Sequence, residues 1–379
     1  MKIAIFTDTF LPELNGVART LGRFAAQLDK LGIEYRVWAP GYRRPIESSP
    51  SVIRIPSVAF PLYPECRAAF PNPWRIRREL REFDPDIVHI VTEFNVGVVG
   101  FRAARKLGIP TVSSYHTNFS HYTRHYRMQW LESTLWWYLR RFHNRTLVTF
   151  CPSETTRREL ESVGMERVKI WSRGIDGHLF SPDKRDVAWR RELGIDDKVV
   201  LTYVGRLGHE KSVELLFDTL RLLNERLSDR IHLLLVGDGP LRPKLEREAP
   251  GNVTFTGFKR GEDLYRAFAS GDIFCFPSVT ETFGNVVIEA MASGLPVVAA
   301  AQGGPVDIIR HGDTGYLFEP ANAAAMARHV EELVMDEPAR LAMAERAVAY
   351  ARTQSWDVVF GKLLADYREI VAAQVAPKA

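Results

Sequence analysis

Cysteine is scarce in this chain, as are the features that would place it outside a reducing compartment. The 379 residues include three cysteines, Cys66, Cys151 and Cys275, and their spacing matches no metal-binding pattern. An odd, scattered set of cysteines indicates a reduced environment and not a disulfide framework. The apolar run after Met1 is too short for the core of a signal peptide. No run approaches the roughly 18 apolar residues of a membrane span, so we expect a cytoplasmic protein.

Two further absences narrow the classes of ligand. No Gly-x-Gly-x-x-Gly follows the first expected strand, Lys2–Thr7, which argues against a dinucleotide site there. No nucleic-acid-binding motif is present, so nucleic acid is not an expected partner. Asp84–Pro85–Asp86 has the Asp-x-Asp form that some enzymes use to hold a metal, but Asp86 begins the expected strand Asp86–Val91. We therefore expect no metal role for this motif.

The length and composition are those expected of a soluble globular protein. Apolar residues make up 46% of the chain and charged residues 25%. A chain of 379 residues is long enough for two domains with separate cores. Short apolar runs alternate with amphipathic segments along most of the chain, which predicts an α/β fold.

The net charge of +4 is unevenly distributed. Met1–Lys169 holds 25 Lys and Arg against 16 Asp and Glu, whereas the remainder holds 25 against 30. A basic first half favours an anionic partner such as anionic lipid or an acidic acceptor. Pro71–Phe83, with Trp74 among several arginines, and the aromatic- and arginine-rich stretch Ser120–Arg145 are the two candidate segments. Each is either an ordinary helix face or an interfacial contact with anionic lipid.

The stretch Pro277–Glu289 has the most informative pattern. It follows the expected buried strand Ile273–Phe276, and a helix is expected to begin near Asn285. A helix N-terminus after a strand presents free N–H groups and the positive end of a dipole, which suits phosphate. Glu281 lies just before that helix and Glu289 about one turn inside it. The stretch is either an ordinary strand–loop–helix unit or a site for a ligand with an anionic middle and hydroxyl-rich ends, such as a sugar nucleotide.

A second loop carries two cations. Gly205–Ser212 follows the expected strand Val199–Val204, and its Arg206 and Lys211 precede the expected helix Val213–Leu227. Two cations beside helix amides can clamp a diphosphate, although they can also be ordinary surface residues. Gly237–Asp238 follows the next strand, in a turn along which a nucleotide can lie.

The first half offers fewer candidates. His116 follows the expected strand Thr111–Tyr115, and ligands in such sheets bind beyond the carboxyl ends of the strands. Asp8 and Asn15–Gly16 lie in the loop after the first strand, with Gly16 as the expected tight point before the helix Val17–Leu31. Asn15–Gly16 either serves turn chemistry alone or contacts a ligand.

Together these motifs resemble a known family. Glu281-x-Phe283-Gly284-x-x-x-x-Glu289 is similar to the Glu-x7-Glu signature of retaining glycosyltransferases with the GT-B fold, in the family 4 group. The other motifs appear in the family's order, so the resemblance covers nearly the whole chain. It implies two Rossmann-like domains facing across a deep cleft. Residues 1–170 plus 355–379 would form the acceptor-side domain, and 171–354 the donor-binding domain.

The resemblance also implies roles. Arg206, Lys211 and the helix amides near Gly284 would stabilise the departing diphosphate, which replaces a metal. Glu281 and His116 would contact the donor sugar, and Glu289 the ribose. The implied donor-binding residues are Gly16, Gly205, Gly237, Asp238, Phe283, Gly284, Asn285 and Glu289. The residues assigned to the acceptor or membrane side are Asp8, Asn15, Trp74, Arg75 and Arg78. No cofactor and no metal is expected beyond the nucleotide diphosphate sugar itself.

The subgroup rests on shorter motifs. Thr7–Pro12 and His116–Phe119 look most like bacterial mannosyltransferases and sulfoquinovosyl-type glycolipid transferases. The implied donor is GDP-mannose or a UDP-hexose, and the implied acceptor a lipid-linked precursor at the inner face of the membrane. The chain departs from the family at Arg173, where many relatives have Asn, and at Asp307, where they have Glu. A sugar-nucleotide epimerase or hydrolase, or a non-catalytic binding module, are the alternatives.

Overall fold

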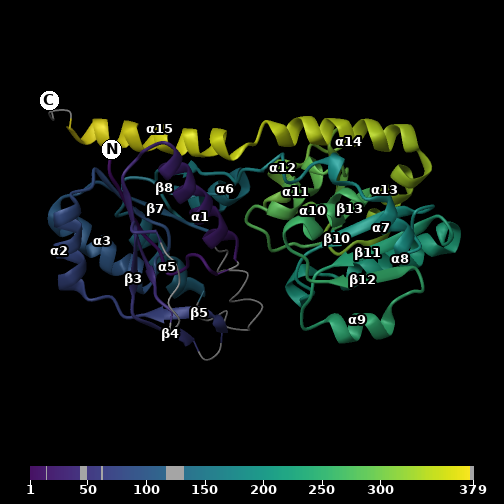
Figure 1. Cartoon of the computed structure of the whole chain (residues 1–379), viewed down its shortest axis with the longest axis horizontal. Helices are drawn as coiled ribbons and strands as arrows, with labels where there is room; N and C mark the ends of the chain where they lie inside the picture. The colour runs from purple at the N-terminus through teal and green to yellow at the C-terminus, as the bar shows by residue number, and fades with distance from the viewer. Residues whose placement is uncertain (14, 43–48, 61–62, 117–131, 376–379) are drawn as a thin grey trace. The chain divides into compact units, whose positions relative to one another are not determined.

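Two parallel sheets form the framework of the molecule (Figure 1). The computed structural model describes residues 1–379 except 14, 43–48, 61–62, 117–131 and 376–379. The chain divides into one unit of Met1–Ser172 with Val359–Ala379 and a second of Arg173–Val358. Each unit has its own sheet and its own apolar core.

The first unit is built on a seven-stranded parallel sheet with the order β3-β2-β1-β6-β7-β8-β9. Its strands are β1 (Ile3–Phe6), β2 (Tyr35–Pro40), β3 (Val52–Ile55), β6 (Ile87–Ile90), β7 (Thr111–Ser114), β8 (Thr149–Cys151) and β9 (Val168–Ile170). The central strands β1, β6 and β7 are buried throughout, as expected where helices cover both faces of a parallel sheet. A separate antiparallel pair joins β4 (Ser57–Phe60) to β5 (Tyr63–Ala69).

Among the described residues, the helices of the first unit are α1 (Gly16–Lys30), α2 (Pro73–Phe83), α3 (Asn95–Leu107), α5 (Glu132–His143), α6 (Glu154–Ser162) and α15 (Trp356–Val375). Helices α2 and α3 pack against each other, side by side in Figure 1. Phe24 of α1 contacts Phe360 and Tyr367 of α15, so the last helix of the chain completes the core of the first unit.

The second unit has a six-stranded parallel sheet with the order β12-β11-β10-β13-β14-β15. Its strands are β10 (Val199–Val204), β11 (Ile231–Val236), β12 (Val253–Gly257), β13 (Ile273–Phe276), β14 (Val297–Ala300) and β15 (Gly315–Phe318). Its helices are α7 (Val187–Glu192), α8 (Glu214–Leu227), α9 (Arg242–Glu248), α10 (Gly261–Ala269), α11 (Asn285–Ala292), α12 (Pro305–Ile308), α13 (Ala323–Met335) and α14 (Glu337–Arg352). Helix α8 packs with α13, and α11 packs with α14.

The two sheets share one topology. In each, the chain runs outward to one edge through three strands and then returns to the middle for the rest. The order therefore reverses between β1 and β6 in the first unit and between β10 and β13 in the second. In open parallel sheets, ligands bind in the crevice beyond the carboxyl ends of the strands at this switch point. The switch points are therefore where each unit is expected to bind a ligand.

Two predicted strands of the second unit, Val199–Val204 and Ile273–Phe276, are confirmed with their bounds.

Helix α3 was not predicted, because glycines and valines dominate its first turns. Burial explains it. A Cβ on Gly100 would lie 2.4 Å from the Phe6 ring, so this glycine lets α3 pack directly on β1.

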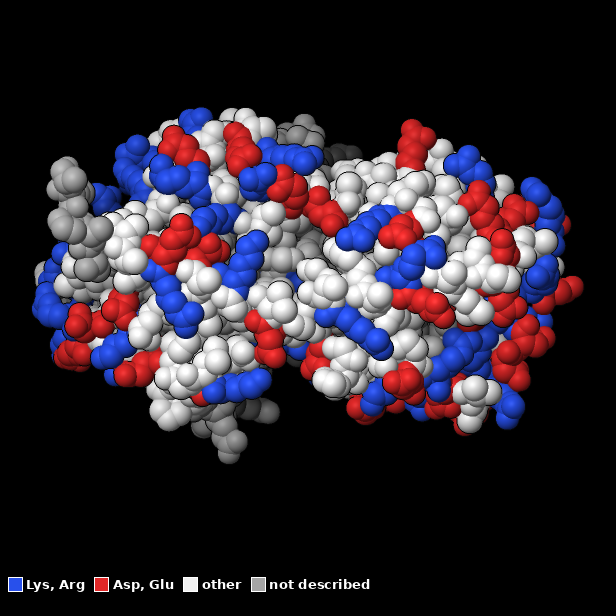
Figure 2. Space-filling model, turned by 90° about the horizontal axis from the view of Figure 1, so that it is seen from above, with Lys and Arg blue, Asp and Glu red and all other residues white. Residues whose placement is uncertain are grey.

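The surface is mixed in charge on the face that Figure 2 shows, where basic and acidic side chains alternate over both units. The excess of positive charge in the first half is therefore not gathered on that face. Within the described part of the chain, no helix is long and apolar enough to cross a membrane.

Candidate active site

The switch point of the second sheet brings two loops together. One follows β10 and carries Arg206 and Lys211, and the other follows β13 and carries Glu281. The Thr280 hydroxyl donates a hydrogen bond to the main-chain oxygen of Glu210 at 3.1 Å, so a side chain of one loop holds the backbone of the other. The cations and the carboxylate predicted from separate motifs thus occupy one place in the fold.

The loop after β10 is tightly folded over its own strand. The hydroxyl of Tyr203 donates to the main-chain oxygen of Arg206 at 3.0 Å. The Arg206 side chain is 48% exposed, with its Nε 4.0 Å from Glu210 Oε1. A short 3-10 helix, His209–Lys211, then leads into α8. This folding holds the main chain of Arg206 while leaving the guanidinium open to solvent.

Two predicted donor-binding glycines, Gly205 in this loop and Gly237 after β11, have a structural explanation. Gly237 has φ +150°, and a Cβ there would lie 1.9 Å from the main-chain oxygen of Gly205. A Cβ on Gly205 would lie 2.8 Å from the Tyr203 hydroxyl. Both positions therefore require glycine for close packing within the protein, and their contact with a donor stays a prediction.

The Lys211 and Glu281 side chains form an ion pair. Lys211 Nζ donates to Glu281 Oε1, and the same oxygen accepts from Ser278 Oγ at 3.1 Å. The lysine side chain is 23% exposed and the glutamate 19%, while Ser278 is fully buried. The main-chain oxygen of Glu281 also accepts from the Gly304 amide at 2.8 Å. The carboxylate is thus held by Lys211 and Ser278, and the main chain of Glu281 by Gly304, while the carboxylate remains within reach of solvent.

Helix α11 begins directly beyond this loop. Its N-cap, Gly284, has φ +89° and provides no side-chain hydrogen bond. Phe283 is buried in the core and anchors the turn, while Asn285 and Glu289 are partly exposed on the first two turns. A helix start without a side-chain cap leaves amide groups available for an anion.

The turn Gly237–Asp238 lies beside the loop Gly205–Ser212, which we call the cation loop because it carries Arg206 and Lys211. The main-chain oxygen of Asp238 accepts from the Leu207 amide at 3.0 Å, which joins the two turns. The exposed Asp238 carboxylate accepts from the Gly239 amide at 2.8 Å and from Arg242 at 3.3 Å. Asp238 therefore shapes its own turn, and its predicted role toward a nucleotide is untested.

At the switch point of the first sheet, Asp8 serves as a cap. It follows β1, and its carboxylate accepts from the Val96 amide at 2.9 Å and the Thr92 hydroxyl at 2.7 Å. Asp8 thus caps α3 from another strand. Burial raises the pKa of Asp8, while these hydrogen bonds oppose the rise. The carboxylate that we assigned to the acceptor side has a structural task, and its contact with an acceptor stays a prediction.

Glu93 is a second carboxyl at the same edge, two positions before α3. Its side chain is 3% exposed, and its Oε1 has no hydrogen-bond partner among the described residues. Burial, with a smaller contribution from the charge of Asp8, raises the pKa of Glu93 to about 8. Glu93 is therefore a neutral acid at pH 7.

Asn15 and Gly16 belong to the start of α1. Asn15 Oδ1 accepts from the Ala18 amide at 2.9 Å and caps the helix, and its Nδ2 donates to Thr9 Oγ1 at 2.6 Å. Gly16 is the first residue of α1, so the prediction that it forms a tight turn in the preceding loop was wrong. The cap at Asn15 lets the helix begin one residue earlier than we predicted.

His116 follows β7 in the first unit, so the four predicted catalytic residues are divided between the units. Its ring makes an edge contact with Trp171, with centroids 5.3 Å apart. The motif residues after it, Thr117–Phe119, lie outside the described residues, as does Ser120–Leu131 of the aromatic segment.

The arginines of α2 are only partly free. Trp74 is 74% exposed, and the Arg77 guanidinium lies 4.8 Å from the centre of its ring. Arg75 and Arg78 form ion pairs with the glutamates one turn further on, at 2.6 and 3.7 Å. Two of the cations assigned to a membrane contact are therefore partly neutralised within the helix.

Three residues at the switch points escaped the motif analysis: Tyr203, Ser278 and Glu93. Tyr203 is the penultimate residue of β10 and Ser278 follows β13 by two residues, so a polar group close to the end of an apolar strand could have pointed to them. Nothing in the sequence indicates that Glu93 is buried, since a single glutamate near the start of a helix is usually exposed. Among the described residues, no group of three or more His, Cys, Asp or Glu could hold a metal ion.

The chain matches two family models that together span most of its length. Residues 14–178 match Glycosyltransferase Family 4, and residues 186–352 match Glycosyl transferases group 1. The chain is also similar to a GDP-mannose-dependent alpha-mannosyltransferase of Mycobacterium tuberculosis, with 35% identity over 98% of this chain and 97% of that protein. A protein of the same description from Mycolicibacterium smegmatis is 36% identical, over 98% of each chain.

Other matches either cover less of the relative or are less identical in sequence. The sulfoquinovosyl transferase SQD2 of Arabidopsis thaliana is 36% identical over 76% of this chain and 58% of that protein. Among solved structures, a sucrose-phosphate synthase from Thermosynechococcus elongatus has a TM-score of 0.81 at 20% identity, covering 98% of this chain and 99% of that one. Anabaena HepE, solved in complex with UDP-glucose, has a TM-score of 0.74 at 21% identity, with 97% and 99% coverage. These likenesses show the GT-B type of fold, with two Rossmann-like domains.

Proposed function

Because the chain belongs to the family 4 glycosyltransferases, we propose that it transfers mannose from GDP-mannose to a lipid-linked acceptor, with retention of configuration and without a metal ion. The chain is a hexosyltransferase that uses a nucleotide sugar. The donor base, the sugar, the stereochemistry and the metal independence are the parts that we propose.

One observation supports this proposal above the others. Arg206, Lys211 and Glu281 meet at the switch point of the second sheet, next to the uncapped start of α11. Positive charge, helix amides and a carboxylate are the three groups that a diphosphate joined to a sugar would use. The choice of GDP-mannose over a UDP-hexose follows the names of the relatives that are similar over their full length.

The chemistry centres on the leaving group. When the bond between the anomeric carbon and the phosphate oxygen breaks, negative charge builds on the diphosphate. Arg206 and Lys211 would stabilise that charge together with the amides of α11, which supplies what a metal supplies elsewhere. Binding of the diphosphate would give Lys211 a second anion, so it would exchange its contact with Glu281 for one with phosphate.

That exchange gives Glu281 its role. Its carboxylate, still held by Ser278, would accept hydrogen bonds from the hydroxyls of the donor sugar. Glu289, on the second turn of α11, would bind the ribose hydroxyls. His116 of the first unit would contact the sugar. Retention would follow from attack on the same face that the leaving group departs from, with the departing phosphate taking the acceptor proton, so that no protein nucleophile is needed.

The acceptor and the membrane belong to the same proposal. A lipid-linked acceptor lies at a bilayer, and a basic first unit with an exposed Trp74 suits a peripheral contact with anionic lipid. The relatives named as glycolipid enzymes include an alpha-monoglucosyldiacylglycerol synthase of Streptococcus pneumoniae, at 29% identity over 79% of this chain. The proposed location is the cytoplasmic face of the membrane.

A two-stage experiment tests the proposal. Thermal melting is first measured with GDP-mannose, UDP-glucose and ADP-glucose, and we expect the largest increase with GDP-mannose. Transfer is then assayed with diacylglycerol and monoglucosyldiacylglycerol in mixed micelles, with and without EDTA. An α-linked mannoside whose formation is unaffected by EDTA is the expected product. Stabilisation by UDP-glucose alone would overturn the donor, a β-linked product the stereochemistry, and abolition by EDTA the metal independence.

A further inference from the structure

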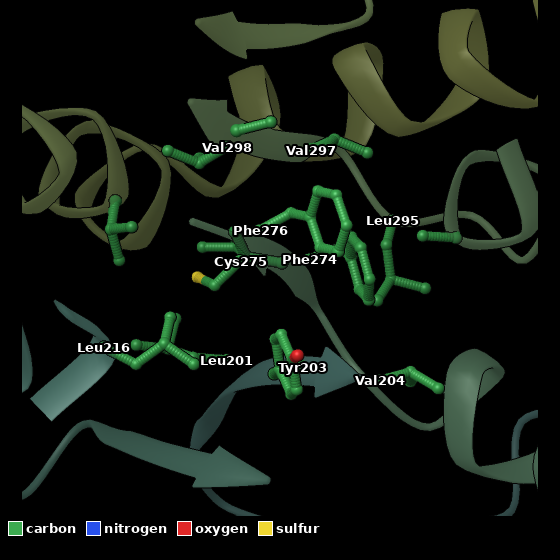
Figure 3. Close-up of a cluster of buried hydrophobic side chains, with 14 of the residues drawn as sticks. Leu201, Tyr203, Val204, Leu216, Phe274, Cys275, Phe276, Leu295, Val297 and Val298 are labelled. Carbon is green, nitrogen blue, oxygen red and sulfur yellow. The ribbon is translucent and has the colours of Figure 1, made fainter. Parts of the chain in front are cut away.

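The side chain of Tyr203 lies beneath both loops of the candidate active site. It is the penultimate residue of β10 and is fully buried in the core of the second unit (Figure 3). Its hydroxyl donates to the main-chain oxygen of Arg206 at 3.0 Å. Its ring is stacked against Phe276, the last residue of β13, with centroids 6.4 Å apart. One side chain therefore contacts the cation loop through its hydroxyl and the strand that leads to Ser278 and Glu281 through its ring.

The surroundings keep this hydroxyl in one place and in one protonation state. A side chain on Gly205 would collide with it, since a Cβ there would lie 2.8 Å from the oxygen. Burial, followed by the charges of Glu281 and Glu210, raises the pKa of Tyr203 far above its ordinary value. The hydroxyl is therefore neutral at neutral pH, where it remains a hydrogen-bond donor.

We propose that Tyr203 is a positioning residue of the diphosphate site, which fixes the main chain of Arg206 so that its guanidinium meets the leaving group. The inference rests on the proposed function and adds a residue to it. The guanidinium is partly exposed and its loop leaves the strand directly, so a hydrogen bond at the base of the loop decides where the charge is held. Stabilisation of a transition state depends on such preorganised charge, and a misplaced cation loses part of its effect.

The test is a double-mutant cycle of Tyr203→Phe, Arg206→Ala and the double variant. Phenylalanine keeps the ring and its contact with Phe276 and removes only the hydroxyl. The loss of one hydrogen bond should lower kcat by about 3- to 10-fold, with a smaller change in KM for the donor. The double variant should be no slower than Arg206→Ala alone, because without the guanidinium the position of its main chain no longer matters.

A matched control and a second measurement keep the outcomes separate. Tyr265→Phe removes a hydroxyl of the same unit that makes no hydrogen bond among the described residues, and it should leave kcat unchanged. Thermal melting checks that each variant is folded. The same cycle is repeated on GDP binding by calorimetry, where Tyr203→Phe should weaken affinity only while Arg206 is present.

Additive losses in the cycle, or a Tyr203→Phe variant as active as the control, would overturn the inference. If the wild type binds GDP but transfers no sugar, the proposed function fails while the binding cycle still decides the role of Tyr203. If the wild type binds no nucleoside diphosphate, both fail.

Discussion

The two switch points have the same topology and opposite chemistry. Beyond β10 and β13 in the second unit, the side chains of Arg206, Lys211 and Glu281 are partly exposed, and Lys211 pairs with Glu281. Beyond β1 and β6 in the first unit, Asp8 is used as a helix cap, and Glu93 is buried and neutral. The same strand order therefore serves an open charged site in one unit and a closed carboxyl pair in the other.

The sheet topology therefore determines where a site can form, but it does not determine which charged groups are available there. A parallel sheet directs helix N-termini and loop side chains to its carboxyl edge in both units. In the first unit, Asp8 occupies the amides at the start of α3, so that helix has less to offer an anion. In the second, the start of α11 has no side-chain cap. The absence of a side-chain cap on α11 is the physical reason for our proposal that the donor binds to the second unit.

Removal of charge from the second switch point is expected to have the largest effect. Arg206→Ala and Lys211→Ala should each lower kcat by about 100- to 1,000-fold, since each removes a preorganised charge from the leaving group. Steady-state transfer from GDP-mannose is the measurement. Arg221→Ala, an exposed arginine of α8 paired with Asp218, is the matched control and should be near wild type. Near-normal kcat in both site variants would show that this switch point is not the catalytic one.

The two glutamates of the second unit are expected to have different effects on binding and on transfer. Glu289→Ala should weaken GDP binding by about 10- to 100-fold, because a charge-assisted contact with the ribose is lost. Glu281→Ala should spare GDP binding and lower transfer instead, because it frees Lys211 for the diphosphate while removing a sugar contact. Calorimetry with GDP and transfer assays on both variants separate the two roles. The opposite pattern would exchange them.

The buried acid of the first unit predicts a pH dependence of stability. Glu93 has a pKa of about 8 in the folded protein against an ordinary value of 4.5. Between these values the folded state holds a proton that the unfolded state has lost, so stability falls as the pH rises, by at most about 1.4 kcal/mol per unit. Glu93→Gln should remove this fall. The free energy of unfolding of the variant, relative to wild type, should therefore be about 2 kcal/mol higher at pH 8 than at pH 6.5.

Urea unfolding at pH 5, 6.5 and 8 tests this expectation. Glu166→Gln, an exposed glutamate of the same unit, is the control and should follow the wild type at each pH. GDP binding should be unchanged in Glu93→Gln, since the donor is placed on the other unit. Parallel pH profiles for Glu93→Gln and wild type would show that Glu93 is not a neutral acid.

The smallest expected effect concerns the surface of the first unit. Among the described residues, Arg77 and Arg81 of α2 have no carboxylate within ion-pair distance, whereas Arg75 and Arg78 do. Replacing Arg77 and Arg81 by Ser should weaken binding to anionic vesicles by about fivefold per residue, as expected for about 1 kcal/mol per cation.

The matched variant, Arg75→Ser with Arg78→Ser, should have a smaller effect, because each of these cations already has a partner. Vesicle sedimentation with anionic and neutral lipid, at low and high salt, is the measurement. Equal binding to the two kinds of vesicle would move the acceptor into the aqueous phase.

Much of the framework could be predicted from the pattern of residues. The strand Ile273–Phe276 and the loop that follows it were evident because a short apolar run ends at Pro277. The loop Gly205–Ser212 was evident for the same reason, because it follows the apolar strand Val199–Val204. Helix α3 was missed, because its glycines are tolerated only through contact with β1, a strand about 90 residues earlier in the chain.

The class of protein could be predicted from the sequence alone. The Glu281–Glu289 motif and the Arg206–Lys211 loop are each local in the chain, so their residue types and spacing are visible without the fold. Tertiary structure alone decided which groups meet. The pairing of Lys211 with Glu281 joins residues 70 positions apart, and Asp8 caps a helix 88 positions away. It also decided that Glu93 is neutral, because a pKa follows from burial and neighbouring charge, and neither exists until the chain has folded.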